Sequence, residues 1–581
     1  MKKLKRSRSD ESQFRTLTRS ERRKQEHERA KLKKTAKRGQ IVLPRRAFEL
    51  HRYWVFALVL VIVLCSAGIR LRLLQMPLER DEGEYAYAGQ LILHGIPPYL
   101  EAYNMKLPGV YVSYALIMAV LGQTIAGIHI GLILVNSGCI VLVFFLAKRL
   151  FDSLAGLVAC ASFAVLSVSP SVLGTSAHAT HFVILPALGG LLLLLKNSES
   201  RRPLTVFLSG LLFGLAFVMK QPGFFFIVFG MLYLVWANVR MRPIAWRKVL
   251  VETGYFSLGA AIPFGLTCLI LFASGVFSRF WFWTFSYAAH YASETPVSRA
   301  PAKFWEAVRN AASPSIWLWA VAGVGLVSVW WTKTWREKAV FVTGLLLFSF
   351  FAVCPGFYFR QHYFIPLLPV VAILTGAAAS SARNFLERKR VPAVLQLWIP
   401  VAMFFLALCH SVIQQQRFFF ELSPQDACRA LYGSGFPESI EIARYVKTNS
   451  APTDRIAVFG SEPQIYFYAR RRSATGYIYA YSLMEEQKYA LKMQRQMIAE
   501  IEAARPTYII YAKLSRSWLW RPKSEVMIFD WFAQYLKEYK QVGFADMLSN
   551  EQTVYRFGDE ATSYSPRSSD YIAVYKRKTS G

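Results

Sequence analysis

The chain has 581 residues, of which 54% are apolar and 15% aromatic, and its mean hydropathy is +0.28. This composition excludes an ordinary soluble protein and is typical of a polytopic membrane protein. The formal net charge of +32 does not indicate nucleic acid as a partner, because Lys and Arg gather in an N-terminal tail and in short clusters between apolar segments.

The N-terminal tail, residues 1–50, is too long and too charged for a cleavable signal peptide. We therefore predict that the tail is cytoplasmic and that the first apolar segment is a retained membrane anchor. Its positive charge suits anionic headgroups, so membrane lipids are expected partners.

Residues 51–411 contain eleven apolar segments, and a helix needs about 20 such residues to cross a bilayer. The segments are 53–72, 125–147, 152–171, 181–196, 204–219, 222–238, 251–274, 316–332, 339–355, 365–381 and 392–411. With the N-terminus inside, every basic cluster between them falls on the cytoplasmic side. We interpret residues 107–123 as a helix in the outer interface, because a further span there would place Lys148 and Arg149 outside.

Residues 415–581 have a different pattern, in which apolar runs shorten to strand length at 455–460 and 507–511. Helical patterns stand between these runs, and a hairpin is expected at 541–557. Strands alternating with helices predict a small α/β domain, and the topology places it outside the cell membrane. The predicted fold class is a polytopic α-helical membrane protein with about 11 transmembrane helices, interfacial helices in the first outer loop and a C-terminal extracytoplasmic α/β domain.

The first outer loop carries the most informative residues, beginning with Asp81 and Glu82 directly after the first apolar segment. Ionisable groups near a membrane core are functional candidates by default. Asp81 also suits the N-cap of a helix that ends near His94, with Glu84 at the third position of that helix. Asp81, Glu84 and Tyr85 then share one helix face. Capping alone and catalysis both remain interpretations of this carboxylate.

Lys106 stands 25 residues after Asp81, in front of Leu-Pro-Gly. Pro108 suits the first turn of the next helix, and a helix N-terminus beside an ammonium group makes a phosphate site. A lysine that merely snorkels at the interface is the alternative.

Further candidates lie at the outer ends of later segments. Lys220 precedes a Pro-broken turn, and Arg360 carries a positive charge that runs against the usual bias of outer loops. A lipid phosphate would explain both charges, whereas an aromatic interface belt is the alternative. The other substrate-lining candidates are His178, Thr180, His181, His290, His362 and Tyr363.

A metal site is not predicted. His178 and His181 stand three residues apart, as two ligands on one helix face would, but the sequence supplies no evident third ligand. We therefore expect no cofactor, although a divalent metal is not excluded.

These motifs together resemble the bacterial GT-C glycosyltransferases. The resemblance is to the branch that holds protein O-mannosyltransferases, the aminoarabinose transferase of lipid A and the lipopolysaccharide-core galacturonosyltransferases. It covers roughly residues 50–410. The motifs that carry it are Arg80-Asp81-Glu82, Tyr103-Asn-Met-Lys106-Leu-Pro-Gly109, Lys148-Arg149-Leu-Phe, Met219-Lys220-Gln-Pro-Gly223 and the run from Phe357 to Pro369.

The resemblance implies an inverting enzyme of the cytoplasmic (inner) membrane that takes a sugar from a polyprenyl-phosphate carrier on the outer face. The acceptor would be a cell-envelope glycolipid, lipopolysaccharide or protein. Asp81 would act as general base or orienting carboxylate beside Glu82, Lys106 would hold the carrier phosphate, and Arg360 would assist. Two departures weaken the case for a metal and leave the acceptor open. Thr180 stands where a second acidic residue is frequent, and Met105 stands where the aminoarabinose branch has an acid.

Two other functions are compatible with the sequence, a transporter or flippase of lipid-linked sugars and a non-catalytic subunit of envelope assembly. Against a transporter, the ionisable residues gather on one side of the membrane and no inverted repeat is apparent. Against a non-catalytic subunit, Asp81 and Lys106 are both present.

Overall fold

The computed structural model describes residues 45–200 and 202–578. The chain divides into two units, Met1–Leu58 and Val59–Gly581, and every contact described below lies within the second. Most of the predicted basic tail, residues 1–50, lies outside the described residues.

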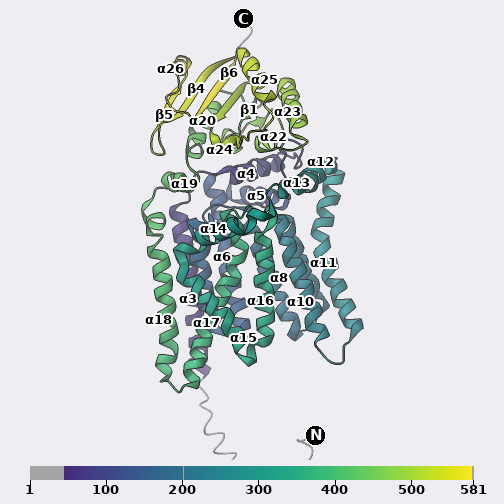
Figure 1. Ribbon diagram of the computed structural model, residues 1–581, viewed down its shortest axis with the longest axis vertical. Helices are drawn as coiled ribbons and strands as arrows, with labels where there is room; N and C mark the ends of the chain where they lie inside the picture. Colours follow the sequence, from purple (N-terminus) through teal and green to yellow (C-terminus); the bar gives the residue numbers. More distant parts are fainter. Residues whose placement is uncertain (1–44, 201, 579–581) are drawn as a thin grey trace, which may run out of the picture. The chain divides into compact units, whose positions relative to one another are not determined.

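Each of the eleven predicted segments contains a helix (Figure 1). The helices are α3 (Arg45–Arg72), α6 (Ile125–Leu150), α7 (Ser153–Val168), α8 (Ala179–Ser200), α9 (Pro203–Met219), α10 (Phe224–Val239), α11 (Trp246–Ala273), α15 (Ile316–Trp331), α16 (Arg336–Val353), α17 (Leu368–Arg388) and α18 (Ala393–Ile413).

Within the described residues, eight stretches are long and apolar enough to cross a membrane. Helices α7 and α9 are shorter, at 16 and 17 residues, and the first turn of α16 carries three charged side chains. The prediction of a multi-pass membrane protein is therefore confirmed, whereas the count of eleven spans stays a prediction.

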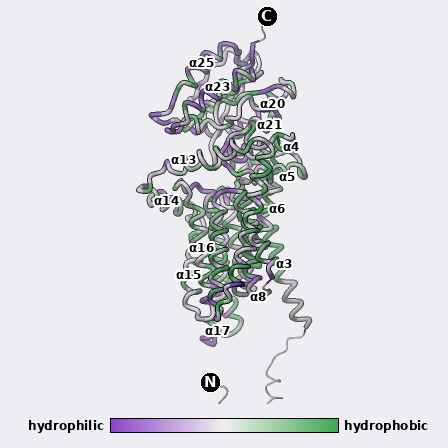
Figure 2. Tube along the Cα trace, turned by 90° about the vertical axis from the view of Figure 1, so that its right-hand side faces the viewer, coloured by the Kyte–Doolittle hydropathy of each residue, from purple (hydrophilic) through white to green (hydrophobic). Residues whose placement is uncertain are grey.

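Helix α17 belongs to the most deeply buried of these eight stretches, residues 361–388, whose apolar part is 94% buried. Glycines allow its neighbours to approach closely, as is common between membrane helices. A Cβ at Gly376 of α17 would lie 2.3 Å from the carbonyl oxygen of Ala155 in α7, and a Cβ at Gly325 of α15 would lie 2.0 Å from that of Leu374. Figure 2 shows apolar residues prevailing along these helices and hydrophilic ones prevailing around α23 and α25.

The first outer loop contains α4 (Arg80–Leu93) and α5 (Gly109–Leu121), which lie between the bundle and the sheet (Figure 1). The predicted cap of α4 is wrong. Glu79 is the N-cap, its carboxylate accepting from the backbone N–H of Glu82 at 3.0 Å, while Glu82 accepts from that of Glu79 at 3.4 Å. The longer Glu79 side chain completes the capping box two residues early, so Asp81 lies inside the first turn with its carboxylate free for other contacts.

Six strands form one mixed sheet near the C-terminus. The strands are β1 (Arg455–Phe459), β2 (Arg472–Ser473), β3 (Tyr508–Lys513), β4 (Tyr539–Met547), β5 (Thr553–Phe557) and β6 (Tyr571–Arg577), in the order β2-β1-β3-β6-β4-β5. β1 runs parallel to β2 and β3, with Val458 opposite Ile510, and β6 lies antiparallel between β3 and β4.

Helices α20 (Phe436–Thr448), α23 (Ala490–Ala504) and α25 (Met527–Tyr535) accompany the sheet (Figure 1). The predicted small α/β fold is confirmed, including the hairpin, although the sequence analysis missed β2 and β6.

The sheet region is joined to the first outer loop by direct contacts. The backbone N–H of Tyr103 donates to the carbonyl of Gly476 at 2.7 Å, and that of Ser473 donates to the Tyr87 hydroxyl at 2.8 Å. A Cβ at Gly83 of α4 would lie 2.6 Å from the backbone nitrogen of Gln464, which begins α21 (Gln464–Ala469). These contacts, together with the hydrogen bond from Tyr479 to Asp81, place the segment 476–485 beside α4.

Candidate active site

Two pockets adjoin where the outer loop, the helix ends and the sheet region meet. The first has a volume of about 190 Å³ and the second about 520 Å³. Both are lined by Asp81, Arg360, His362, Tyr479 and Tyr481. Asp81 is therefore reachable from two sides, as a group that acts between two substrates must be.

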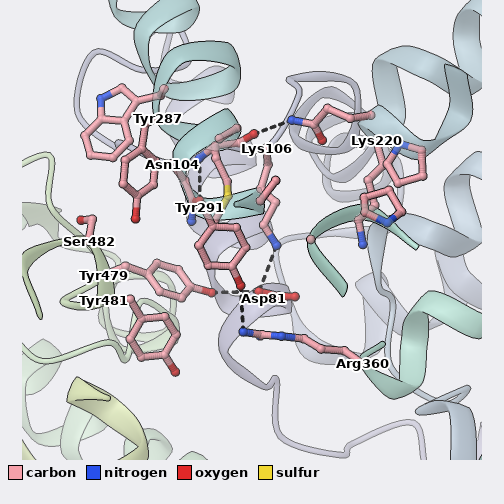
Figure 3. A pocket seen from close by; sticks show the side chains of 18 of the residues that line it. Asp81, Asn104, Lys106, Lys220, Tyr287, Tyr291, Arg360, Tyr479, Tyr481 and Ser482 are labelled. Carbon is pink, nitrogen blue, oxygen red and sulfur yellow. Dashed lines mark hydrogen bonds and ion pairs between the residues drawn. The ribbon is translucent and has the colours of Figure 1, made fainter. Parts of the chain in front are cut away.

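Asp81 is held by hydrogen bonds from two directions (Figure 3). The Lys106 ammonium donates to its Oδ1 at 3.2 Å, and the Tyr479 hydroxyl donates to the same atom at 3.1 Å. Burial would raise the pKa of Asp81, but nearby positive charge, that of Lys106 first, holds this pKa well below its usual range. The carboxylate is therefore ionised and fixed in orientation.

Two more cations line the first pocket near Asp81. The Lys220 ammonium lies 4.3 Å from the centre of the Tyr363 ring, and Arg360 donates to the Tyr291 hydroxyl at 3.0 Å. Burial, followed by the charge of Lys106, lowers the pKa of Lys220 to about 7. Three basic groups around one carboxylate leave excess positive charge, which suits a phosphate.

Glu82, predicted beside Asp81 as a catalytic residue, is fully buried and is absent from the lining of both pockets. Its Oε1 accepts from the backbone N–H of Ala177 at 2.6 Å and lies 3.1 Å from Nε2 of His129. The helix turns successive side chains apart, so Glu82 faces the bundle while Asp81 faces the pocket. This geometry favours a positioning role for Glu82.

Glu84 and Tyr85 stand one layer behind the pocket. The Tyr85 hydroxyl accepts from Lys106 at 3.2 Å, and Glu84 accepts from the Tyr111 hydroxyl. Burial raises the pKa of Glu84 to about 7. Of the predicted helix face, Asp81 and Tyr85 therefore contact Lys106, and Glu84 contacts Tyr111.

The predicted histidines divide into two groups. His178 lines the second pocket, with Nδ1 3.8 Å from Oδ2 of Asp81 and its ring stacked on His362 at 4.2 Å. Thr180 and His181 are buried and belong to the lining of neither pocket. His290 is also outside both linings, although Tyr287 and Tyr291 on either side of it line the first pocket.

Asp81, His178 and His362 each offer one ligand atom, and these atoms lie within 4.8 Å of one another. The sequence pattern paired His178 with His181. In the structure the group consists of Asp81, His178 and His362, and His181 does not belong to it. Burial lowers the pKa of His178 to about 4, so its ring is neutral and could ligate a divalent ion. Lys106 and Arg360 oppose such an ion by charge.

Sequence reasoning missed the contribution of the C-terminal region. Tyr479, Tyr481, Ser482 and Glu485 line the first pocket opposite the cations. Trp283 and Tyr287, from the π-helical turn Phe282–Tyr287, complete that side. Tyr291 of α13 (Ala288–Ala292) lines the pocket beside Arg360. The alternating tyrosines at 477, 479 and 481 were the available signal.

Comparison with known proteins gives one family match and a set of structural matches. The model of the family described as dolichyl-phosphate-mannose-protein mannosyltransferase matches residues 106–266. Comparison with curated proteins gives no match.

Among solved structures, ArnT from Cupriavidus metallidurans bound to undecaprenyl phosphate is similar with a TM-score of 0.55 at 13% identity, over 90% of this chain and 98% of that chain. The Archaeoglobus fulgidus oligosaccharyltransferase in complex with zinc and sulfate gives a TM-score of 0.50 at 13% identity, over 86% and 73% of the two chains. The predicted resemblance is confirmed in fold by these two structures, and the family match supports it in sequence over residues 106–266.

Proposed function

We propose that this protein is an inverting glycosyltransferase of the cytoplasmic membrane. It transfers a sugar from a polyprenyl-phosphate carrier to a cell-envelope glycolipid, lipopolysaccharide or protein on the outer face. The observation that carries the proposal is an ionised carboxylate, Asp81, ringed by Lys106, Lys220 and Arg360 between two pockets. The mannosyltransferase family match over residues 106–266 supports glycosyl transfer as the activity.

The cations bind and orient the carrier phosphate, and they stabilise its charge as it leaves. The acceptor hydroxyl enters from the second pocket and attacks the anomeric carbon. A carbon–oxygen bond forms to the acceptor, the bond to the phosphate oxygen breaks with its electron pair, and the proton passes to Asp81. Base assistance of this kind contributes about 10²–10⁴-fold.

Donor binding would also prepare the base. When no donor is bound, the surrounding cations hold the pKa of Asp81 low, and the carboxylate is a weak proton acceptor. A bound phosphate offsets this positive charge and thereby raises the pKa of Asp81. The carboxylate becomes a better base when the donor is in place, which disfavours proton uptake in the empty site.

An apolar groove next to the site suits the chain of the carrier. It has a volume of about 860 Å³, and Val112, Leu116, Leu215 and Leu266 from α5, α9 and α11 are among the side chains that line it. Met219 lines the same groove and directly precedes Lys220, so a lipid tail in the groove would bring its phosphate to the cations.

The proposed topology puts residues 1–50 in the cytoplasm, the catalytic bundle of residues 51–411 in the membrane, and the α/β domain of residues 415–581 outside. Reporter fusions at residues 200, 335 and 450 test it. A cytoplasmic reporter should be active at the first two positions and a periplasmic reporter at the third. Periplasmic activity at 200 or 335, or none at 450, would overturn both the topology and the face on which the site lies.

The function itself is tested with the purified protein and labelled polyprenyl-phosphate sugars. Candidate donors come from mass analysis of the lipid-linked sugars that accumulate in a deletion strain. Transfer of label to an envelope acceptor supports the proposal. Movement of the donor across a liposome bilayer without transfer would instead identify a flippase. If neither transfer nor movement occurs, although the gene restores the deletion strain, a non-catalytic subunit is the better explanation.

A further inference from the structure

The first pocket has two chemically different ends. Lys106, Lys220 and Arg360 mark one end, and Tyr287, Tyr479, Tyr481 and Ser482 lie toward the other (Figure 3). Because the sugar of the donor is bonded to the phosphate, a phosphate on the cations brings the sugar ring against the second end. The two ends therefore correspond to two parts of one donor molecule.

We propose that this second end is the sugar subsite, and that Glu485 selects a neutral or amino sugar and rejects a uronic acid. The inference rests on the proposed function and adds to it the class of sugar.

The subsite is built to hold a sugar ring. Trp283 is 5% exposed, and its indole stacks on the Tyr103 ring with 5.8 Å between centres. Tyr287 packs edge-on against Trp283 at 5.1 Å. Rings fixed in this way present apolar surface to the C–H face of a sugar and keep polar groups at their edges.

Glu485 supplies the charge at this end. Its side chain is buried, and among the described residues the Tyr287 hydroxyl is the side-chain group that donates to it. Burial raises the pKa of Glu485 to about 7, although the hydrogen bond from Tyr287 opposes this rise. A sugar hydroxyl or ammonium group can donate to this carboxylate and compensate for its burial.

Nearby cations are occupied by other partners. Arg521 donates to both carboxylate oxygens of Glu294, at 2.9 and 3.2 Å, and Arg360 donates to Tyr291 at 3.0 Å. The cations among the residues that line the first pocket are the three at the phosphate end. Arg521 and Arg360 also lower the pKa of Glu485 by their charge, so a uronate would compete with Glu485 for positive charge that Glu294 and Tyr291 already share. Two carboxylates sharing a buried site cannot both ionise cheaply.

The test uses the full-length protein in lipid nanodiscs and four probes of equal chain length. These are polyprenyl phosphate alone and polyprenyl phosphate carrying a neutral hexose, an aminohexose or a hexuronic acid. The wild-type protein should bind the neutral and amino donors about tenfold more tightly than the uronic donor, the effect of one charged hydrogen bond.

Glu485→Gln should reduce this ratio to below about threefold while changing the affinity for polyprenyl phosphate alone by less than twofold. Glu486→Gln is the matched control, because Glu486 is the next residue and is exposed. Tyr287→Phe removes the donor to Glu485 and should change the ratio in the same direction, so it carries the test if Glu485→Gln does not fold.

The outcomes separate the two proposals. If polyprenyl phosphate alone does not bind, the proposed function fails. If it binds but the wild-type protein accepts the uronic donor as tightly as the neutral one, or Glu485→Gln leaves the ratio unchanged, the sugar assignment alone is overturned.

Discussion

The two ends of the first pocket come from different parts of the chain. The charged end is built from the first outer loop and from breaks between membrane helices, with Asp81 and Lys106 tied to each other at 3.2 Å. The aromatic end is built in part from residues 479–485 of the C-terminal region, where one carboxylate lies among tyrosines. The cations can bind the phosphate, which all donors have in common. The aromatic end would contact the sugar, which differs from donor to donor.

This difference separates activity from choice of substrate. Substitutions at the charged end should weaken the reaction with every donor by a similar factor. Substitutions at the aromatic end should change the ratio between donors. The charged end should therefore govern how strongly any donor binds and reacts, and the aromatic end which donor is preferred.

The largest effect is expected for Asp81→Asn. An amide keeps the size of the side chain and can still accept from Tyr479, but it cannot take a proton, so turnover should fall by about 10²–10⁴-fold. The measurement is sugar transfer by the purified variant, with the melting temperature as a check of folding. Glu441→Gln, at a partly exposed position that pairs only with Arg444 among the described salt bridges, is the control. Wild-type turnover by Asp81→Asn would show that Asp81 has only a structural role.

Loss of a phosphate ligand should have the next largest effect. Lys106→Met should weaken donor binding by about 10- to 150-fold, because one charged hydrogen bond is worth roughly 1.5–3 kcal/mol. Lys106→Arg should retain part of the affinity, since the charge survives without the compact ammonium geometry. Titration with polyprenyl phosphate measures this effect, and unchanged affinity in Lys106→Met would leave an interfacial lysine as the better explanation.

Arg360 tests whether the cations share one phosphate. If they do, the double variant Lys106→Met/Arg360→Met should lose less affinity than the sum of the single losses predicts. Strictly additive losses would separate Arg360 from the phosphate site and shrink the charged end to two cations.

Several of these residues were predictable from local pattern, and others were not. The helix predicted over residues 107–123 corresponds to α5, and the choice of Asp81 and Lys106 as candidate residues follows from short motifs. Their contact with each other was not predicted. The cap at Glu79 was missed because Glu79 and Asp81 each have a glutamate three residues later, so both satisfy the same capping pattern. Local pattern also cannot tell that Glu82 faces the bundle, because its partners His129 and Ala177 are 47 and 95 residues away.

The C-terminal side of the pocket could not be predicted from local sequence pattern either, because its contacts are also distant in the chain. The Tyr479 hydroxyl meets Asp81 across 398 residues of chain. Its position depends on the strand pairing that orders the sheet and on the contact between Gly83 and Gln464. A run of alternating tyrosines indicates a surface or a site, but only the tertiary fold says which pocket it borders.

A smaller effect is expected from the titration of Lys220, whose pKa is about 7. Below pH 7 its ammonium group is charged and attracts the phosphate, and above pH 7 it is neutral. Because bound phosphate favours the charged form, donor binding takes up a proton above pH 7, and affinity should fall by up to about tenfold per pH unit there. Titrations from pH 6 to 9 measure this slope.

Lys220→Met should remove most of the slope and bind weakly even at pH 6. Glu84 and Glu485, whose pKa values are also raised to about 7, gain negative charge over the same range and account for any slope that remains. Affinity independent of pH in the wild-type protein would exclude Lys220 from the phosphate site.

The smallest effect concerns the contact that holds the two parts of the pocket together. Glu101 of the outer loop accepts from Arg455 at 3.1 Å and from Nε of Arg472 at 2.9 Å, and both arginines are partly exposed. Solvent screens such pairs, so Glu101→Gln should cost less than about 1 kcal/mol of stability and should leave the ratio between donors unchanged. The buried contacts of Tyr87 and Gly83 with the sheet region remain in this variant and keep residues 479–485 in place. Thermal unfolding and the binding assay with the four probes measure the two quantities. A marked loss of donor selectivity with little loss of stability would mean that the ion pairs, rather than the buried contacts, align the aromatic end with the charged one.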